Sequence, residues 1–502
     1  CLVLLCDAVC LMREKGFKAG SYFYHDGTDF AYHFNTHSQT SIYFKCVFYD
    51  AGCHGRAILK LGGNFRHSKA HNHPPDPFFV QERQFRTSLL AKVRESKWVK
   101  FKDILELERF NKRYHPKVSS RMTLRRLRTT MQNERTKSHP KIPQTLEKLT
   151  DILVDPQYRW LTASVDKRDN IYAGSVNAVD GTHCVLFMSE RMLDFCGRIT
   201  LIQSDGTFKS RPAVPASAQV FSLVTTWKNF IIPIGWVLMG RRSRPAYDAV
   251  LELLKTLNPE ICPSYVITDF EIAQQEAWKT AFPGCKVQGC LFHLSQAFIK
   301  KARKLGLAKY WKMIPEVLNY IRRCTAISLL PKNLFTRALD LLQHNVRQEC
   351  IEAAYLLHPF FQYVRTKWIN RRSRRDYMSF WRCEHRTNNA CESHHTVLRH
   401  KMGAHHPNIF EFMDRLTEME QTAYYDVGLL AEGNLPGRTR RYKSVLTDRR
   451  LNGLNRDIVG LRLLRNRNET ILRFLVRAAE LNVGLFNRLT EARQRRRQQQ
   501  QY

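Results

Sequence analysis

Three acidic residues of this chain stand where their carboxylates could share metal ions. Asp205 follows the apolar run RITLIQS and opens DGTFK, and Asp269 ends a second apolar run, SYVIT. Acids at the ends of neighbouring buried strands project from one edge of a sheet, where such sheets display ligand sites. Glu392 lies in the helical stretch NNACESHH, which Asn388 or Asn389 could cap. We therefore expect the three acids to meet at one end of a sheet.

Carboxylate oxygens suit hard divalent cations such as Mg²⁺ or Mn²⁺, which also keep positions open for substrate. Three carboxylates could hold two such ions about 4 Å apart. One ion would activate water or a 3′-hydroxyl, and the other would stabilise the leaving oxygen of an in-line phosphoryl displacement. Each acid taken alone is more typical of a turn or a helix cap, and Glu271 is a nearby acid that lies beyond the strand end.

A second group of side chains has the composition of a structural zinc site. It comprises two thiols and two imidazoles: Cys46, Cys53, His71 and His73. Two thiolates and two imidazoles would complete a closed tetrahedral shell around Zn²⁺. The metal would supply the folding free energy that a short β segment lacks. His54 and His67 are competing ligands, and the alternative is a coincidence of half-buried cysteines with surface histidines.

The elements that must position these residues fall into four regions. Residues 14–80 alternate aromatic and β-branched residues between turn signals, which predicts a small β module. Residues 81–150 carry apolar residues at helical spacing among many basic ones, which predicts a helical linker. Residues 151–430 predict an α/β domain with a mixed sheet, interrupted by a helical insertion at about 298–380. Residues 431–502 predict a basic tail, partly helical and partly disordered.

The charge balance points to a nucleic-acid partner. The 502 residues include 80 Lys and Arg against 45 Asp and Glu, a formal charge of +35. A polyanion gains affinity from each phosphate that such a surface neutralises. No apolar run approaches the roughly 20 residues that span a bilayer, so we expect no membrane segment. The 14 cysteines show no disulfide spacing, which indicates a reducing compartment. Because the chain opens on Cys1 rather than Met, we expect a truncated reading frame.

The N-terminal segment resembles the FLYWCH zinc finger. The aromatic runs GFKAGSYFY and YFKC, a second cysteine followed by HGRA, and a terminal HNH carry this resemblance. It implies the four ligands Cys46, Cys53, His71 and His73, although Tyr43 stands where the family usually has Trp. FLYWCH modules occur in transposase-derived proteins and in DNA-binding or protein-contact roles.

Residues from about 150 to 430 resemble the transposase domain of Mutator-like elements (MULE). The motifs DGTFK, TDFE before a helix, GCLFHLSQA and RTNNACESHH follow one another in the family's order. The resemblance implies a ribonuclease-H-like fold with a helical insertion before the final Glu. It also implies that Asp205, Asp269 and Glu392 are the catalytic, metal-binding triad.

The family also carries a Cys-x2-His motif between its second Asp and its Glu, matched here by Cys290 and His293 in CLFH. These two residues could form a second zinc site with partners nearer Glu392. The candidate partners are His394 and His395 or, alternatively, Cys383 and His385. The other interpretation is that Cys290 packs in the core and His293 makes a hydrogen bond.

Two functions are compatible with these features. The first is a DDE-type transposase that cleaves and joins DNA at terminal repeats, working as a homo-oligomer in the nucleus. The alternative is a domesticated, non-catalytic DNA-binding or chromatin protein that keeps the transposase fold. The basic stretches at 84–135 and 438–467 could follow a DNA backbone. The clusters RRSRR (371–375) and RQRRR (492–496) could serve nuclear import or could be solvated surfaces.

Overall fold

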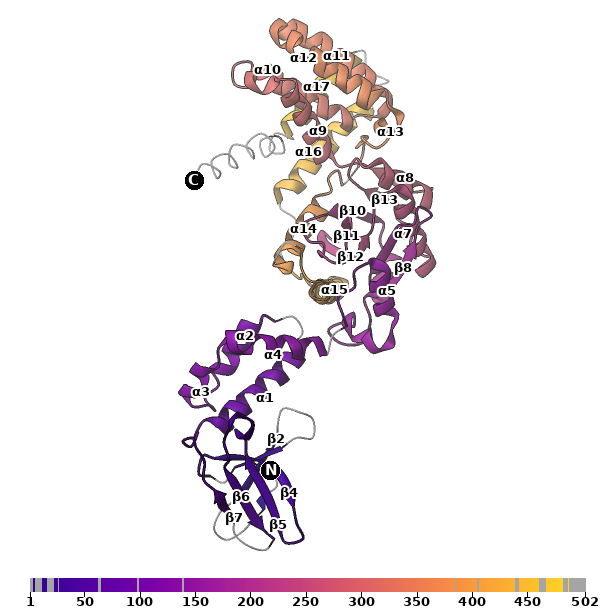
Figure 1. Ribbon diagram of the computed structural model, residues 1–502. Coiled ribbons are helices and arrows are strands. Elements are labelled where there is room, and N and C mark those ends of the chain that lie inside the picture. Colours follow the sequence, from indigo (N-terminus) through magenta and orange to yellow (C-terminus); the bar gives the residue numbers. More distant parts are fainter. Residues whose placement is uncertain are drawn as a thin grey trace. The chain divides into compact units, whose positions relative to one another are not determined.

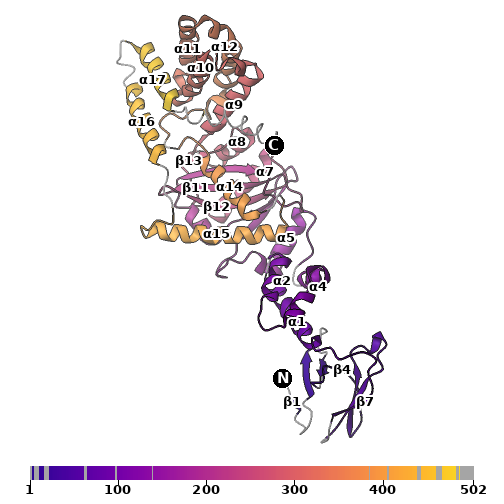
Figure 2. The same cartoon turned by 90° about the vertical axis from the view of Figure 1, so that its left-hand side faces the viewer.

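The structure is a computed structural model and is shown in Figures 1 and 2. It describes residues 3–4, 11–15, 22–25, 27–61, 65–96, 99–137, 140–383, 385–403, 406–437, 442–459, 466–481 and 486. The chain divides into two compact units, Cys1–Lys141 and Ile142–Tyr502. The terminal RQRRRQQQQY, for which disorder is predicted, lies outside the described residues.

The first unit contains an antiparallel sheet whose seven strands pair in sequence order. The strands are β1 (Val3–Leu4), β2 (Leu11–Lys15), β3 (Tyr22–His25), β4 (Ala31–His37), β5 (Ser41–Cys46), β6 (Arg56–Lys60) and β7 (Phe65–Lys69). Alternation along the strands buries one thin aromatic layer, in which Tyr32, Phe44 and Phe65 are almost inaccessible. So small a core leaves the sheet in need of an additional constraint.

Four helices follow in the same unit. They are α1 (Phe79–Glu95), α2 (Phe101–Arg109), α3 (Pro116–Arg121) and α4 (Leu124–Lys137). All but α2 carry more basic than acidic residues. Their apolar residues, among them Phe85, Leu89 and Met131, form one core. The buried Glu108 carboxylate is paired with Lys92 at 2.6 Å and accepts a hydrogen bond from Tyr114 at 2.8 Å. This pairing offsets the cost of burying the charge.

The second unit is built on a mixed seven-stranded sheet with the order β14-β13-β10-β11-β12-β9-β8. The strands are β8 (Tyr172–Asn177), β9 (His183–Phe187), β10 (Leu201–Thr207), β11 (Gln219–Trp227), β12 (Phe230–Met239), β13 (Tyr265–Ile267) and β14 (Lys286–Gln288). Strands β10, β13 and β14 run parallel, and the other neighbours pair antiparallel. A two-residue hairpin turn at Lys228–Asn229 joins β11 to β12, with φ of 46° and 70°.

Helices cover both faces of this sheet. They are α5 (Leu146–Val154), α6 (Glu190–Cys196), α7 (Arg244–Leu257), α8 (Ile272–Ala281), α14 (Asn389–Met402) and α15 (Ile409–Ala431). On β11, Phe221 and Leu223 belong to the core that includes α7, whereas Val224 contacts the start of α14. This alternation of neighbouring residues assigns α7 and α14 to opposite faces. Helix α15 runs along β12 (Figure 2).

The helical insertion forms a body of its own within the second unit (Figure 1). It contains α9 (Leu291–Lys304), α10 (Pro315–Ala326), α11 (Phe335–Glu349), α12 (Ile351–Val364) and α13 (Arg372–Arg375). Two helices from the C-terminal region join it, α16 (Tyr442–Val459) and α17 (Arg467–Leu481). Ile471, Phe474 and Leu475 of α17 are buried in its core, so this part of the basic tail is an integral element of the fold.

Two expectations about the whole chain concern membranes and thiols. None of the helices in the described ranges is both long and apolar enough to cross a bilayer. The cysteines in those ranges are free thiols, in agreement with the absence of a disulfide pattern.

Candidate functional site

Asp205, within β10, and Asp269, just after β13, occupy matching positions along two neighbouring parallel strands. Strand β10 pairs with β13 so that Gln203 lies opposite Ile267. Asp205 follows Gln203 by two residues, and Asp269 follows Ile267 by two residues. Because neighbouring strands lie about 4.8 Å apart, the two carboxylates reach the same edge of the sheet.

Helix α14 brings Glu392 to this edge in its first turn. Asn388 directly precedes the helix and is fully buried. Its side chain makes no capping hydrogen bond with the helix; instead its Nδ2 donates to the carbonyl oxygen of Ser204 at 3.2 Å. The predicted cap therefore has a different role, because it fastens the helix that carries Glu392 to the residue before Asp205.

Ser204 is the common attachment point behind the acids. Its hydroxyl accepts hydrogen bonds from Gln274 Nε2 at 2.8 Å and from Trp278 Nε1 at 3.0 Å, both on α8. Helices α8 and α14 are thus both bonded to the residue that precedes Asp205. The sequence offered no more than a weak signal for this role, namely a serine directly before Asp205.

His293 lies between two of the acids. Its Nδ1 is 2.7 Å from Asp269 Oδ1, and its Nε2 is 3.9 Å from Glu392 Oε1. Burial lowers the pKa of His293, but hydrogen bonds to Asp269 and Cys290 outweigh it and raise the pKa to about 11. The imidazole is therefore a cation between the two carboxylates. Cys290 is buried and its Sγ accepts a hydrogen bond from the Asn388 backbone N–H at 3.2 Å.

Burial and the negative charges of Asp269 and Glu392 raise the pKa of Asp205 to about 8, against the opposing effects of the His293 cation and the Gly206 N–H. The Asp205 side chain is only 17% exposed. The dependence of one carboxyl on the charge of the other two places all three acids in one electrostatic cluster. Such a cluster favours either a shared proton or a bound cation.

The two histidines of α14 have different surroundings. His395 Nδ1 lies 3.6 Å from Asp205 Oδ2, and its Nε2 is 3.3 Å from Ser222 Oγ. His394 instead accepts a hydrogen bond from Trp236 Nε1 at 2.9 Å. Burial lowers the pKa of His395 to about 4 and that of His394 to about 3, so both are neutral near pH 7. Neither compensates the charge of the acids.

The partners considered for a second zinc site stand apart from the Cys-x2-His motif. Cys383 Sγ accepts a hydrogen bond from Lys286 Nζ at 2.9 Å. In the part of the chain that the structure describes, Cys290 and His293 join no other His, Cys, Asp or Glu in a group of three ligand atoms within 4.8 Å. The three acids do not form such a tight group either, since the His293 ring stands between two of them.

Glu271 has a separate partner set. Its carboxylate forms an ion pair with Arg242 and accepts a hydrogen bond from Tyr247 OH at 3.1 Å. The same tyrosine hydroxyl accepts a hydrogen bond from Gln219 Nε2 at 2.8 Å. Gly206 of the DG motif lies against this glutamine, because a Cβ at position 206 would be 1.9 Å from Gln219 Oε1. The glycine after Asp205 is therefore required by close packing inside a strand and not by a turn.

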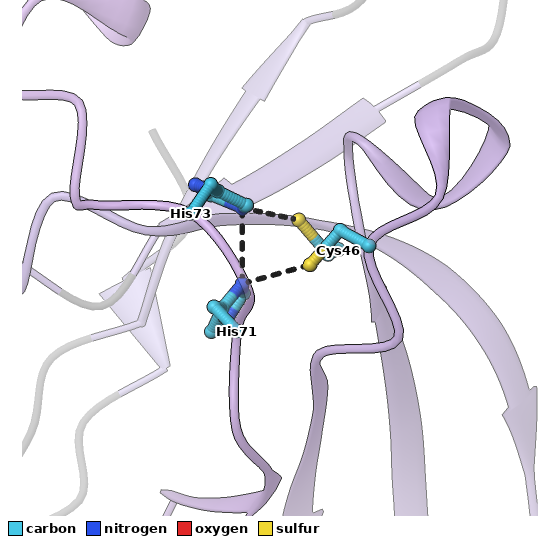
Figure 3. Close-up of side chains that lie close together, drawn as sticks. Cys46, His71 and His73 are labelled. Carbon is cyan, nitrogen blue, oxygen red and sulfur yellow. Dashed lines mark hydrogen bonds between the residues drawn. The ribbon is translucent and has the colours of Figure 1, made fainter.

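In the first unit, the four predicted zinc ligands are gathered at one point, with ligand atoms within 4.8 Å of one another. Cys46 Sγ is 3.3 Å from His73 Nε2, Cys53 Sγ is 3.5 Å from His71 Nδ1, and the two imidazole nitrogens are 3.2 Å apart. Figure 3 shows Cys46, His71 and His73 pointing toward one another. Two thiols and two imidazoles in this arrangement could bind zinc.

Surrounding groups orient these ligands. Tyr32 OH lies 3.0 Å from His71 Nε2, and the Pro74 carbonyl oxygen lies 2.8 Å from His73 Nδ1. Each histidine thus uses one ring nitrogen toward the cluster and the other toward a fixed polar partner, as metal-binding histidines do. A Cβ on Gly55 would lie 2.5 Å from the His71 ring, so only glycine lets the ring approach. Within the described residues, His54 and His67 stand outside the group.

The two thiols differ in acidity. Burial raises the pKa of Cys46 to about 11. Burial acts in the same direction on Cys53, but the backbone N–H groups of Gly55 and Asn72 outweigh it and lower the pKa of that thiol. The N–H groups of Phe48 and Gly55 donate to the two sulfur atoms at 3.3 and 3.4 Å, which suits thiolate ligands.

Residues 201–297 match the model of the MULE transposase domain. The matched stretch contains Asp205, Asp269, Cys290 and His293 and ends before Glu392. No curated protein matches the chain. The match supports a transposase-related function, which implies binding to DNA.

Proposed function

We propose that this chain is a DDE-type DNA transposase whose metal-binding acids are Asp205, Asp269 and Glu392. The observation that carries the proposal is the convergence of these acids from distant parts of the sequence at one edge of the sheet. Asp205 responds electrostatically to both of the others, and His293 contacts Asp269 and Glu392. A structural role for each acid separately would not require this convergence.

The donor set fits Mg²⁺ or Mn²⁺. The three acids offer carboxylate oxygens, which are hard ligands of the kind these ions prefer. When bound, the ions would activate the attacking oxygen and stabilise the leaving oxygen at phosphorus. In the protein, Asn388 and Ser204 fix the relative positions of two acids, and the His293 cation neutralises part of their charge. His293 would have to move from between Asp269 and Glu392 if both bind the same ion.

The sheet supports a ribonuclease-H-like fold. Three antiparallel strands, β10 to β12, are followed by two strands parallel to β10, and the first two acids lie at matching positions of neighbouring parallel strands, Asp205 within β10 and Asp269 just after β13. The insertion separates them from the helix that bears Glu392. In the first unit, the four-ligand cluster on an aromatic sheet supports a FLYWCH-type zinc finger that contacts DNA or protein. We further propose a nuclear, oligomeric protein, because transposition joins two element ends.

Cleavage of DNA tests this proposal. The purified full chain, incubated with duplex DNA carrying the ends of its own element, is expected to nick it in Mg²⁺ or Mn²⁺. Ca²⁺ or EDTA should leave the DNA intact, because binding does not suffice for phosphoryl transfer. Products are resolved on a denaturing gel. Binding of the DNA without metal-dependent cutting would contradict the proposal and favour the non-catalytic alternative.

A further inference from the structure

The basic cluster RRSRR at 371–375 is part of the folded structure. Backbone N–H groups of Arg374 and Arg375 both donate to the Arg371 carbonyl oxygen at 2.9 Å, which begins α13. The Asp376 N–H donates to the Arg372 carbonyl oxygen at 3.1 Å. A nuclear import signal is read as an extended peptide, whereas this segment is coiled and held on both sides. We call residues 371–375 the α13 platform.

Aromatic contacts connect the α13 platform to the acidic site. The Arg374 guanidinium lies over the Trp368 ring, 5.0 Å from its centroid. Trp368 is buried and meets the Phe270 ring edge-on at 5.0 Å. Phe270 directly follows Asp269 in the chain. A chain of contacts therefore runs from Arg374 through the Trp368 ring to Phe270, the residue that follows an acid of the site.

Hydrogen bonds after the platform fix its position on the sheet. The Tyr377 carbonyl oxygen accepts a hydrogen bond from the Gly289 N–H at 2.6 Å, just beyond β14. The Tyr377 hydroxyl donates to Glu276 of α8 at 2.6 Å. The platform is thus anchored both to the strand end and to a helix of the sheet. Figure 1 shows α13 near α8 and β13.

The platform carries more positive charge than its surroundings offset. Asp376 lies 3.2 Å from Lys332 and 3.9 Å from Arg372, so one carboxylate serves two cations. Burial and the neighbouring charge of Arg371 lower the pKa of Arg374, as expected where cations crowd together. The Arg372 side chain is 89% exposed. The exposed guanidinium groups of Arg371 and Arg372, on a segment anchored by Arg374 over Trp368, present donors to phosphate oxygens.

We propose that the α13 platform binds the sugar–phosphate backbone of the duplex whose strand enters the acidic site. This rests on the proposed function for the location of the DNA. Duplex DNA carries about one negative charge per 1.7 Å of its axis. A duplex whose strand reaches Asp269 therefore also presents phosphates to the nearby α13 platform. The contacts are to the backbone and supply affinity and register rather than base recognition.

The salt dependence of DNA binding tests the proposal. The full chain is titrated with a fluorescent 30-base-pair duplex of arbitrary sequence in Ca²⁺, and log Kd is measured against log salt. In Arg371→Gln/Arg372→Gln the slope is expected to fall by about 2, because roughly 0.9 counterions are released per phosphate contact. The matched control Lys309→Gln/Lys312→Gln removes the same charge from exposed residues of the insertion and should keep the wild-type slope.

The outcomes separate this inference from the proposed function. A lowered slope for the platform variant alone, with an unchanged circular dichroism melt, supports it. An unchanged slope overturns it, even if the wild type cuts DNA. An equal fall of the slope in both double variants also overturns it, because such a result would mean that any loss of positive charge weakens DNA binding. If the platform variant loses binding to a purified import receptor but keeps the wild-type salt dependence of DNA binding, the cluster serves nuclear import and the inference is overturned as well.

Discussion

Replacing Asp205 with Asn is expected to lower DNA strand cleavage by on the order of 10³-fold or more while making the metal-free protein more stable. The loss of cleavage follows because the amide cannot supply an anionic oxygen to a divalent ion. The gain in stability follows because burial and two neighbouring carboxylates already disfavour the charge of Asp205. A residue selected for packing would give the opposite result, with a loss of stability on substitution.

The stability gain should depend on pH. The pKa of Asp205 is about 8 in the folded chain and near 3.9 in the unfolded chain, so the folded state retains a proton that the unfolded state releases. Stability of the wild type therefore falls as pH rises from about 4 to about 8, and the full penalty is present above pH 8. The variant avoids this penalty, which we place at about 2–4 kcal/mol after allowing for relaxation and water access.

The measurement is the melting temperature of the transition that belongs to the second unit, followed in EDTA from pH 4 to 9. The difference between variant and wild type should be near zero at pH 4 and largest at pH 9. Asp194→Asn, an exposed acid on α6, is the matched control and should change neither cleavage nor stability. A variant that is less stable than the wild type at pH 9 would argue that Asp205 is a structural residue.

Removal of zinc, or Cys46→Ser, is expected to unfold the sheet of the first unit. The buried aromatic layer is thin, and zinc binding contributes roughly 10 kcal/mol or more to small metal-dependent folds at neutral pH. Serine is a poor ligand for zinc, so the tetrahedral shell would lose one of its four members. Amide hydrogens of β4, β5 and β6 should then exchange at least about 10³-fold faster, as judged by mass spectrometry of the full chain.

His67→Gln supplies the comparison for this experiment. His67 was a competing ligand by sequence, and its Nδ1 lies 3.1 Å from Tyr32 OH, outside the four-ligand group. We expect this variant to keep one zinc per chain and to retain most of the protection of β4 to β6 against amide hydrogen exchange. The second unit should exchange normally in every case. Unchanged exchange of β4 to β6 after complete chelation would show that the sheet folds without a metal.

The parts of the site that depend on local pattern could be predicted from the sequence. Apolar runs that end in Asp located Asp205 and Asp269 on neighbouring strands, although the expected strand end at Asp205 was wrong, because β10 continues to Thr207 by pairing with β11. The four zinc ligands lie within one short segment, so spacing alone brought them into consideration. Chemistry and local geometry suffice for such features.

Features that depend on distant contacts could not be predicted. Asn388 is predicted to cap a helix, but its side chain donates a hydrogen bond to Ser204, which is 184 residues away in the chain. The position of His293 between Asp269 and Glu392 requires α9 and α14 to be placed first. Helix α17 falls in the stretch predicted as a basic tail, because its three arginines stand among the apolar residues at helical spacing that enter the core of the insertion. The basic composition of this stretch therefore does not indicate that α17 packs in a core.

Binding of Mn²⁺ to the full chain measures the central claim most directly, because it reports on the acidic cluster whether or not the correct DNA is supplied. With zinc already bound, electron paramagnetic resonance should show Mn²⁺ held by the wild type. Asp269→Asn should weaken this binding by about 100-fold or more, and Asp194→Asn should not weaken it. Equal Mn²⁺ affinity in the wild type and Asp269→Asn would mean that the three carboxylates do not form a metal site.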